Sequence, residues 1–390
     1  VLKNINSYNI SKINILNLKK LDKSVVEDYT NSLIKKNYKS EEMLASIYNL
    51  YGSGYFDKIN YNFQKNETDT DFNLNLYLVE KNYYSLNLGF YADEYYNAVG
   101  CLGISKNNID KFGSKLDFET NFGLYKKIKL KYTTLNTTKL KLTSQITTSY
   151  IDSFIKLFND SFFINNDYFR YKDISFNISK YVSFHSAFNI SLNFSKFSSS
   201  LNQSTPYSKI ELSFKYDNLK DYIFPANSSN FCIKYSKFLS HNYKNSEKLY
   251  LGTSYFPLIY RNTLLIINSG IGLSSHEINF IEKFTSGGPD EIPGYYRNEF
   301  RTDNLYFLTL GGVYKIREYK SLLKQKIYCS ILSGIAEIKN NKNFSFDYNN
   351  LLYGITAKFI LSTNFGNLEI IGGCNRKKQM HFYFQYGYKL

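Results

Sequence analysis

The residues best suited to metal or redox chemistry are four cysteines and four histidines, and their spacing predicts neither. The cysteines are Cys101, Cys232, Cys329 and Cys374, and the histidines are His185, His241, His276 and His381. No CxxC pair occurs, and no histidine neighbours a cysteine at a spacing typical of zinc ligands. We therefore predict no metal site and no cofactor.

Serine chemistry would require a nucleophile beside a base. A patatin-type hydrolase carries its serine in a GxSxG turn, and the chain lacks that motif. The nearest approach, Gly52-Ser53-Gly54, is too short and falls where a helix is expected to stop. We expect no catalytic residues and no enzyme activity in this segment. A Ser/His/Asp group assembled on barrel strands, as in outer-membrane lipases, is the alternative, and a lipase assay of the chain would decide between them.

A stretch rich in glycine and proline is the segment best suited to hold a fixed shape. Residues 276–301, HEINFIEKFTSGGPDEIPGYYRNEFR, contain two of the five prolines of the chain. Proline fixes one backbone angle and glycine permits tight turns, so we expect a stiff connection. We predict a tongue that folds into the interior of the molecule, with Tyr295 and Arg297 on the inner wall. Its candidate residues are Gly287, Gly288, Pro293, Gly294, Tyr295 and Arg297. An ordinary extracellular loop is the alternative.

The net charge of +15 would suit a nucleic acid or an anionic surface, but the lysines are scattered along the chain. They are better explained as solvated turns and loops, and we do not expect a nucleic-acid partner. No apolar run approaches the roughly 18 to 20 residues of a membrane helix. The chain also opens without a signal peptide, so export would require a leader upstream of Val1.

From residue 82 to residue 390 the sequence alternates apolar and polar residues in segments separated by turns. We count about sixteen such segments, which is typical of an outer-membrane β-barrel. Their expected starts are near residues 83, 95, 113, 126, 138, 169, 183, 207, 228, 246, 258, 302, 324, 351, 366 and 380. Soluble β-sandwiches could make the same pattern. The predicted fold is therefore mainly β, a transmembrane antiparallel barrel.

The last segment shows the alternation most clearly. Its predicted apolar face consists of Phe382, Phe384, Tyr386, Tyr388 and Leu390. Because a sheet in lipid must pair every backbone amide, the final strand has to close onto the first. We predict that this strand closes the barrel.

The first 81 residues have a different pattern, that of a small β-α-α-β-β domain. Asp22 is expected to cap a first helix in which Val25, Val26, Tyr29 and Leu33 fall on one face. A second helix should present one apolar face made of Leu44, Ile47, Tyr48 and Tyr51, and end at the glycines Gly52 and Gly54. Two alternating strands follow, the first with Ile59, Tyr61 and Phe63 on one face and the second with Phe72, Leu74, Leu76 and Leu78.

This combination resembles the BamA and bacterial surface-antigen superfamily. Its members join periplasmic POTRA domains of β-α-α-β-β order to a sixteen-stranded barrel, and their sixth extracellular loop folds back into the lumen. At the tip of that loop the family has Gly-Gly, then Arg-Gly-Phe or Arg-Gly-Tyr. Gly287 and Gly288 match the first part, and Gly294 with Tyr295 matches the second. Pro293 stands where the family has arginine.

The acidic partner of that arginine would fall at Leu332, two residues before Gly334, and it is absent too. Loss of both charges is self-consistent, because a single buried charge would be costly. The departures point to one branch, since Leu50 to Tyr61, including Gly52, Gly54 and Phe56, resembles the POTRA motif of patatin-type (type Vd) autotransporters. The resemblance thus implies that residues 1–81 form a POTRA-like periplasmic domain and that residues 82–390 form the outer-membrane barrel.

The function that follows is to anchor, translocate or assemble polypeptides. The POTRA-like unit would engage an unfolded client or a passenger through a strand edge, and lipid would surround the barrel. Two alternatives remain open. The chain could be a passive porin or receptor, or it could anchor a patatin-like lipase whose catalytic domain lies upstream.

Overall fold

The structure is a computed structural model of the 390-residue chain. It describes residues 9–34, 40–52, 55–65, 71–81, 84–93, 95–134, 142–159, 162–183, 185–200, 205–219, 221, 223–239, 246–275, 278, 280–319, 325–339, 351–363 and 366–387. Gly54, Tyr388, Leu390, His241 and His276 therefore lie outside the described residues. No helix in the described part of the chain is long and apolar enough to cross a membrane.

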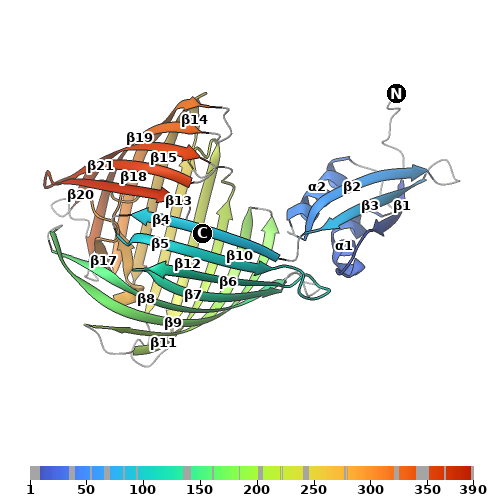
Figure 1. Ribbon diagram of the computed structural model, residues 1–390, viewed down its shortest axis with the longest axis horizontal. Helices are drawn as coiled ribbons and strands as arrows, with labels where there is room; N and C mark the ends of the chain where they lie inside the picture. Colours follow the sequence, from blue (N-terminus) through green and yellow to red (C-terminus); the bar gives the residue numbers. More distant parts are fainter. Residues whose placement is uncertain are drawn as a thin grey trace. The chain divides into compact units, whose positions relative to one another are not determined.

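The chain begins with the predicted β-α-α-β-β order (Figure 1). Its elements are β1 Asn9–Leu16, α1 Lys23–Thr30, α2 Ser40–Gly52, β2 Phe56–Lys65 and β3 Asp71–Glu80, with a short 3-10 turn, Asn31–Leu33, after α1. The three strands form a sheet of order β1-β3-β2, in which β3 is parallel to β1 and antiparallel to β2. Both outer strands of this sheet thus have one edge that no other named strand covers.

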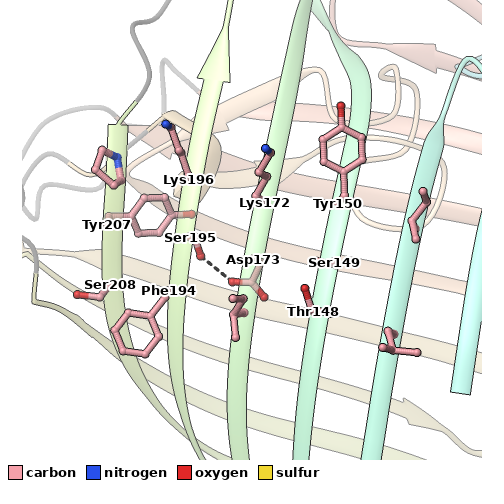
Figure 2. A pocket seen from close by; sticks show the side chains of 14 residues that line it. Thr148, Ser149, Tyr150, Lys172, Asp173, Phe194, Ser195, Lys196, Tyr207 and Ser208 are labelled. Atoms are coloured by element: carbon pink, nitrogen blue, oxygen red, sulfur yellow. Dashed lines mark hydrogen bonds between the residues drawn. The ribbon is translucent and has the colours of Figure 1, made fainter. Parts of the chain in front are cut away.

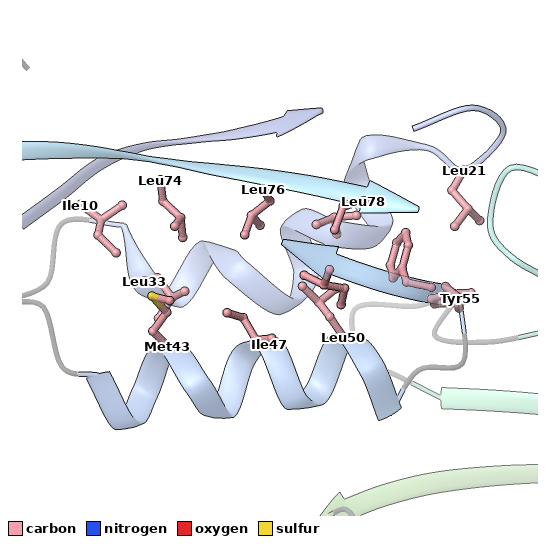
Figure 3. Packing of buried hydrophobic residues seen from close by; sticks show 13 residues of the cluster. Ile10, Leu21, Leu33, Met43, Ile47, Leu50, Tyr55, Leu74, Leu76 and Leu78 are labelled. Carbon is pink, nitrogen blue, oxygen red and sulfur yellow. The ribbon is translucent and has the colours of Figure 1, made fainter. Parts of the chain in front are cut away.

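The core of this unit lies between the sheet and the two helices (Figure 3). Leu74, Leu76 and Leu78 alternate along β3 and are completely buried, because every second side chain of a strand faces the same side. The Asp22 side chain caps α1 by accepting a hydrogen bond from the Ser24 amide, and Val26 is buried, both as predicted.

The predicted buried face of α2 is correct for Ile47 and wrong for its other three residues. Its core side chains are Met43, Ile47 and Leu50, whereas Leu44, Tyr48 and Tyr51 are 43%, 63% and 41% exposed. The helix is apolar on two sides, so its spacing alone did not show which side meets the sheet. The Tyr51 hydroxyl accepts a hydrogen bond from the Ile59 amide of β2 at 2.8 Å, and this polar contact holds the ring at the edge of the core.

The chain divides into two compact units, each made of separate stretches of sequence, and the boundary at residues 81 and 82 stays a prediction. One unit comprises residues 1–86 with 104–118 and 131–145, and the other comprises 87–103, 119–130 and 146–390. Within the first unit, the Tyr55 ring lies over Gly113, and the Asp22 amide donates to the Lys111 carbonyl at 2.9 Å. These contacts place the turn 107–114 with the N-terminal elements.

Seventeen strand segments form one closed antiparallel barrel (Figure 1). They are β4 Tyr84–Asp93, β5 Asn97–Lys106, β6 Lys115–Gly123, β7 Lys126–Thr134, β8 Leu142–Asn159, β9 Phe162–Ser183, β10 Ser186–Ser199, β11 Thr205–Asp217, β12 Ser228–Phe238, β13 Glu247–Phe256, β14 Leu258–Tyr260, β15 Thr263–Ser274, β18 Asn304–Glu318, β19 Lys326–Lys339, β20 Leu352–Thr363, β21 Gly366–Asn375 and β22 Met380–Gly387. Pro257 separates β13 from β14, and both pair with β15, so the barrel has sixteen strands. The predicted fold class is confirmed.

The two faces of the barrel wall differ in polarity. Along β20, Tyr353, Ile355 and Phe359 are exposed, whereas Thr356 and Lys358 between them are buried. Other buried polar side chains of the wall are Thr309, Ser330, Glu337, Asn375 and His381. Since a strand alternates its side chains, the wall is apolar outside and polar inside, which is the pattern of a barrel in a membrane.

The last strand, β22, closes the barrel against the first, β4. Its side chains Phe382, Phe384 and Tyr386 are on the exposed outer face, as predicted, and Tyr383 is buried on the inner face. The described register pairs of this junction are Gln385–Asp93, Tyr386–Ala92 and Gly387–Tyr91. We call the junction of β22 with β4 the seam.

Candidate functional site

The connection between β15 and β18 folds back along the inner face of the barrel. It contains a 3-10 turn, Phe280–Glu282, and two short paired strands, β16 Phe284–Ser286 and β17 Phe300–Thr302. Between these strands Gly287 and Gly288 have φ angles of 122° and 92°, which suit glycine rather than residues with a side chain. We call residues 280–302 the lumenal loop.

The tip of the lumenal loop, Pro293-Gly294, lies directly on the backbone of three neighbouring strands. The wall residues under the tip are Gly334 of β19, Gly354 of β20 and Gly373 of β21. A Cβ atom added to Gly334 or Gly354 would overlap Pro293, and one added to Gly373 would lie only 3.1 Å from the Gly294 Cα. Gly294 has a φ of 83°, and a side chain there would overlap the Cys374 carbonyl. Glycine on both sides therefore allows loop and wall to meet backbone to backbone.

Polar residues of the inner wall hold the stretch before the tip. The Thr309 hydroxyl of β18 donates to the Glu291 carbonyl at 2.6 Å, and the Thr356 hydroxyl of β20 donates to the Pro289 carbonyl at 3.3 Å. Lys358, also on β20, forms a salt bridge with Asp290. All three wall residues point inward, so the loop lies on the lumenal face.

After the tip, the loop contacts β22, the strand that closes the barrel. Tyr295 is 2% exposed, and its carbonyl accepts a hydrogen bond from the Tyr383 hydroxyl. The Tyr296 ring packs edge-on against His381, with ring centres 4.3 Å apart. Arg297 donates to the Gln385 side chain at 3.1 Å, and Gln385 is itself a residue of the seam.

At its base, the lumenal loop is held by a buried charge cluster. Glu282 accepts hydrogen bonds from Lys209 of β11 at 2.8 Å and from Tyr207 at 2.7 Å. Burial favours the neutral form of Glu282, but Lys209 and Lys248 outweigh it and keep its pKa below the ordinary value. The anchored loop thus carries a carboxylate that stays charged.

Glu291 behaves in the opposite way. Its side chain lines a lumenal cavity of about 380 Å³ between the loop and strands β11 to β13. Burial, with a contribution from Asp290, raises its pKa to about 7, although a hydrogen bond from Ser286 at 3.2 Å opposes the shift. This carboxyl therefore changes charge near neutral pH.

A second segment packs against the inner wall at the other end of the barrel. Antiparallel strands alternate direction, so the connection between β11 and β12 lies at the opposite end of the barrel from the lumenal loop. Its residues 223–226, Ile-Phe-Pro-Ala, pack against an apolar part of the wall formed by Leu264, Val313, Tyr328 and Ile360. The Phe224 and Tyr328 rings stack with centres 6.0 Å apart. We call residues 223–226 the inner turn.

The structure brings the predicted loop residues Gly287, Gly288, Pro293, Gly294, Tyr295 and Arg297 together on the lumenal face. Of the predicted POTRA turn, Gly52 is the last residue of α2, and Phe56 is the first of β2 and is 4% exposed. Leu332, at the position where the family has an acid, is 1% exposed on the inner face. In the described residues, no three His, Cys, Asp or Glu side chains are grouped to hold a metal.

Sequence reasoning missed the wall side of this site. Gly354, Gly373 and the pair Lys358–Asp290 were not singled out, and neither was the inner turn. One signal was present, because Gly334, Gly354 and Gly373 interrupt strands in which glycine is unfavourable. The sequence, however, does not indicate which loop packs against each of these glycines.

No protein-family model and no curated protein sequence matches the chain. Solved structures do match its fold. The BamA of Haemophilus ducreyi lacking POTRA domains 1-3 has a TM-score of 0.75 at 13% identity, over 98% of this chain and 85% of that one. CdiB from Escherichia coli has a TM-score of 0.69 at 8% identity, over 98% and 76% of the two chains.

CdiB from Acinetobacter baumannii has a TM-score of 0.65 at 12% identity, over 98% of this chain and 74% of that one. These identities are low, so the likeness is one of fold. At that level the chain has the fold of these BamA and CdiB structures, as predicted. The patatin-type branch stays a prediction.

Proposed function

We propose that this chain is an outer-membrane barrel that translocates or assembles polypeptides. The observation that carries the proposal is the contact of the lumenal loop with β22, the strand that closes the barrel. The loop lies on the inner face and bonds to Gln385 of the seam, and the inner turn packs against the wall at the other end. A barrel that opens sideways toward lipid can pass or template a strand.

The N-terminal unit supplies the second part of the proposal. β2 is an outer strand of its sheet, and Tyr61 and Phe63 on it are 43% and 38% exposed. No other described strand pairs with the outer edge of β2, although the Tyr51 hydroxyl bonds to Ile59 there. A strand edge of this kind beside exposed rings is suited to receive an extended polypeptide by strand addition. We infer that this unit lies in the periplasm and engages an unfolded client or a passenger. The likeness to BamA and CdiB barrels supports this reading.

A passive porin is the alternative. It would leave the N-terminal unit and the loop docking unexplained, since a conducting barrel needs neither. We further infer that the chain is not an enzyme, and lipid hydrolysis by the purified chain would contradict that. A lipase domain upstream would turn the barrel into its anchor without changing the seam.

A disulfide across the seam tests the proposal. In a variant whose four native cysteines are serines, Ala92→Cys and Tyr386→Cys would join register partners of β4 and β22. The matched control, Ile370→Cys with Phe384→Cys, joins β21 to β22 in the same way. Each protein is reconstituted in liposomes and given a urea-unfolded outer-membrane barrel, whose folding is followed by heat-modifiable gel mobility.

We expect the oxidised seam pair to stop folding of the added barrel and a reductant to restore it, while the control pair folds its client in both states. If the oxidised seam variant assembles the client at the rate of the reduced one, sideways opening is not part of the function.

A further inference from the structure

The outer face of the barrel has a groove across strands β7 to β11 (Figure 2). Its volume is about 800 Å³, and the side chains that matter here are Leu130, Tyr150, Lys172, Ile174, Phe194 and Lys196. All six have even residue numbers, as do the exposed apolar residues Ile128, Ile146, Ile178 and Ile190 of the same strands. Leu130, Ile174 and Phe194 are 41%, 48% and 48% exposed, whereas Tyr207 and Ser195 on the opposite face are buried. The groove is therefore on the membrane side of the wall.

Two lysines face each other across this groove. Lys172 of β9 and Lys196 of β10 are register partners, so their side chains leave the sheet side by side. Like charges placed directly opposite on neighbouring strands destabilise a sheet. Neither lysine forms a salt bridge with a described acidic residue. Lys172 instead lies 5.9 Å from the centre of the Tyr150 ring, which offers partial compensation.

The lysines stand at the border of an apolar band. Lys196 is three residues from the end of β10 at Ser199. Toward the middle of the strand, on the same face, the exposed residues are Phe194, Ile190 and Phe188. On β9, Lys172 is followed by exposed Ile174, Phe176 and Ile178. Lipid headgroups lie at such a border and acyl chains lie along such a band.

We propose that this groove binds an anionic phospholipid. The headgroup phosphate would lie between the ammonium groups of Lys172 and Lys196 and neutralise the repulsion between them. The acyl chains would run over Ile174, Phe194 and Leu130. A zwitterionic lipid offers the same chains but no net negative charge, so the site discriminates by charge. The proposal does not rest on polypeptide handling.

The test uses the fact that the chain contains no tryptophan. Phe194→Trp places a single fluorophore in the groove, where brominated acyl chains quench it on contact. The full chain is reconstituted in phosphatidylcholine vesicles containing a minority of phosphatidylglycerol, with bromine on one lipid or on the other. The ratio of the two quenching efficiencies gives the preference for phosphatidylglycerol. Ile190→Trp on the same face of β10 reports the band outside the groove.

We expect a preference on the order of tenfold at position 194, because each lysine at a membrane surface contributes attraction to anionic lipid. The preference should fall toward one in Lys172→Gln/Lys196→Gln and shrink at high salt. Lys180→Gln is the matched control, since Lys180 is on the same face of β9 but opposite Phe188 rather than a second cation. It should leave the preference at position 194 unchanged.

Equal quenching by the two brominated lipids at position 194 would overturn the proposal, and so would a preference that survives the double substitution. Folding of each variant is confirmed by heat-modifiable mobility. The double variant removes a repulsive pair and is expected to be at least as stable as the parent. A negative result here would leave the seam experiment unaffected, because Lys172 and Lys196 are not on the seam strands.

Discussion

Gly294 is the residue at which the lumenal loop depends most on the absence of a side chain. Its φ of 83° is strained for any residue with a Cβ atom, and the Cys374 carbonyl occupies the place that a Cβ would need. We predict that Gly294→Val costs at least about 2 kcal/mol of loop docking and hinders barrel assembly. The loss of heat-modifiable gel mobility measures this.

The matched control is Gly100→Val on β5, where an added Cβ would be 3.7 Å from its nearest neighbour, the Phe122 ring. That variant should assemble like the parent. Unchanged mobility of Gly294→Val would mean that the tip leaves the wall without harm to the barrel.

Glu291 makes loop docking depend on pH. Its pKa is raised from 4.5 to about 7, so the docked state binds the proton more tightly than the unfolded state. The protonated Glu291 side chain stabilises the docked loop fully below about pH 4.5. This contribution falls as the pH rises and is lost above about pH 7. We therefore expect the barrel to unfold at a higher temperature at pH 5 than at pH 8, relative to Glu291→Gln.

The glutamine variant keeps an acceptor for Ser286 and cannot ionise, so it isolates this one group. The measurement is the temperature at which heat-modifiable mobility disappears, compared between the two proteins at each pH. An identical pH dependence in both would assign the effect to other groups.

At the scale of elements, sequence periodicity was sufficient to place the strands in which one face is apolar and the other is polar. The strand starts near residues 126, 228, 366 and 380 coincide with those of β7, β12, β21 and β22, because alternation marks a wall with an apolar and a polar side. The start expected at residue 169 is Phe162 instead. Phe163 and Ile164 are both exposed at that end of β9, which breaks the alternation.

Periodicity was insufficient where contacts are long-range. Helix α2 has apolar side chains on two sides, and the buried leucines of β3 select the side with Met43 and Leu50. The lumenal loop could be recognised by its glycines and prolines. The wall residues that it contacts, however, are on strands up to about 90 residues away in the chain. The pairing of a loop with its wall is a property of the folded barrel, so a local pattern does not contain it.

At the scale of the whole molecule, the lumenal loop and the inner turn lead to a prediction about ion conductance. The lumenal loop enters from one end and the inner turn from the other, so we expect small and noisy single-channel conductance in a planar bilayer. Replacing residues 287–297 with a short Gly-Ser linker should enlarge it, because that stretch covers the inner face of β18 to β22. Large steady pores in the unmodified protein would favour the porin alternative.

The seam also ties the barrel wall to the lumenal loop. Arg297 of the loop donates to Gln385 at 3.1 Å, and Gln385 is the register partner of Asp93 on the first barrel strand. The junction at which the sheet closes is therefore braced from inside the lumen. We expect withdrawal of the loop to remove this brace, so that the two strands of the seam separate under a smaller outward tension.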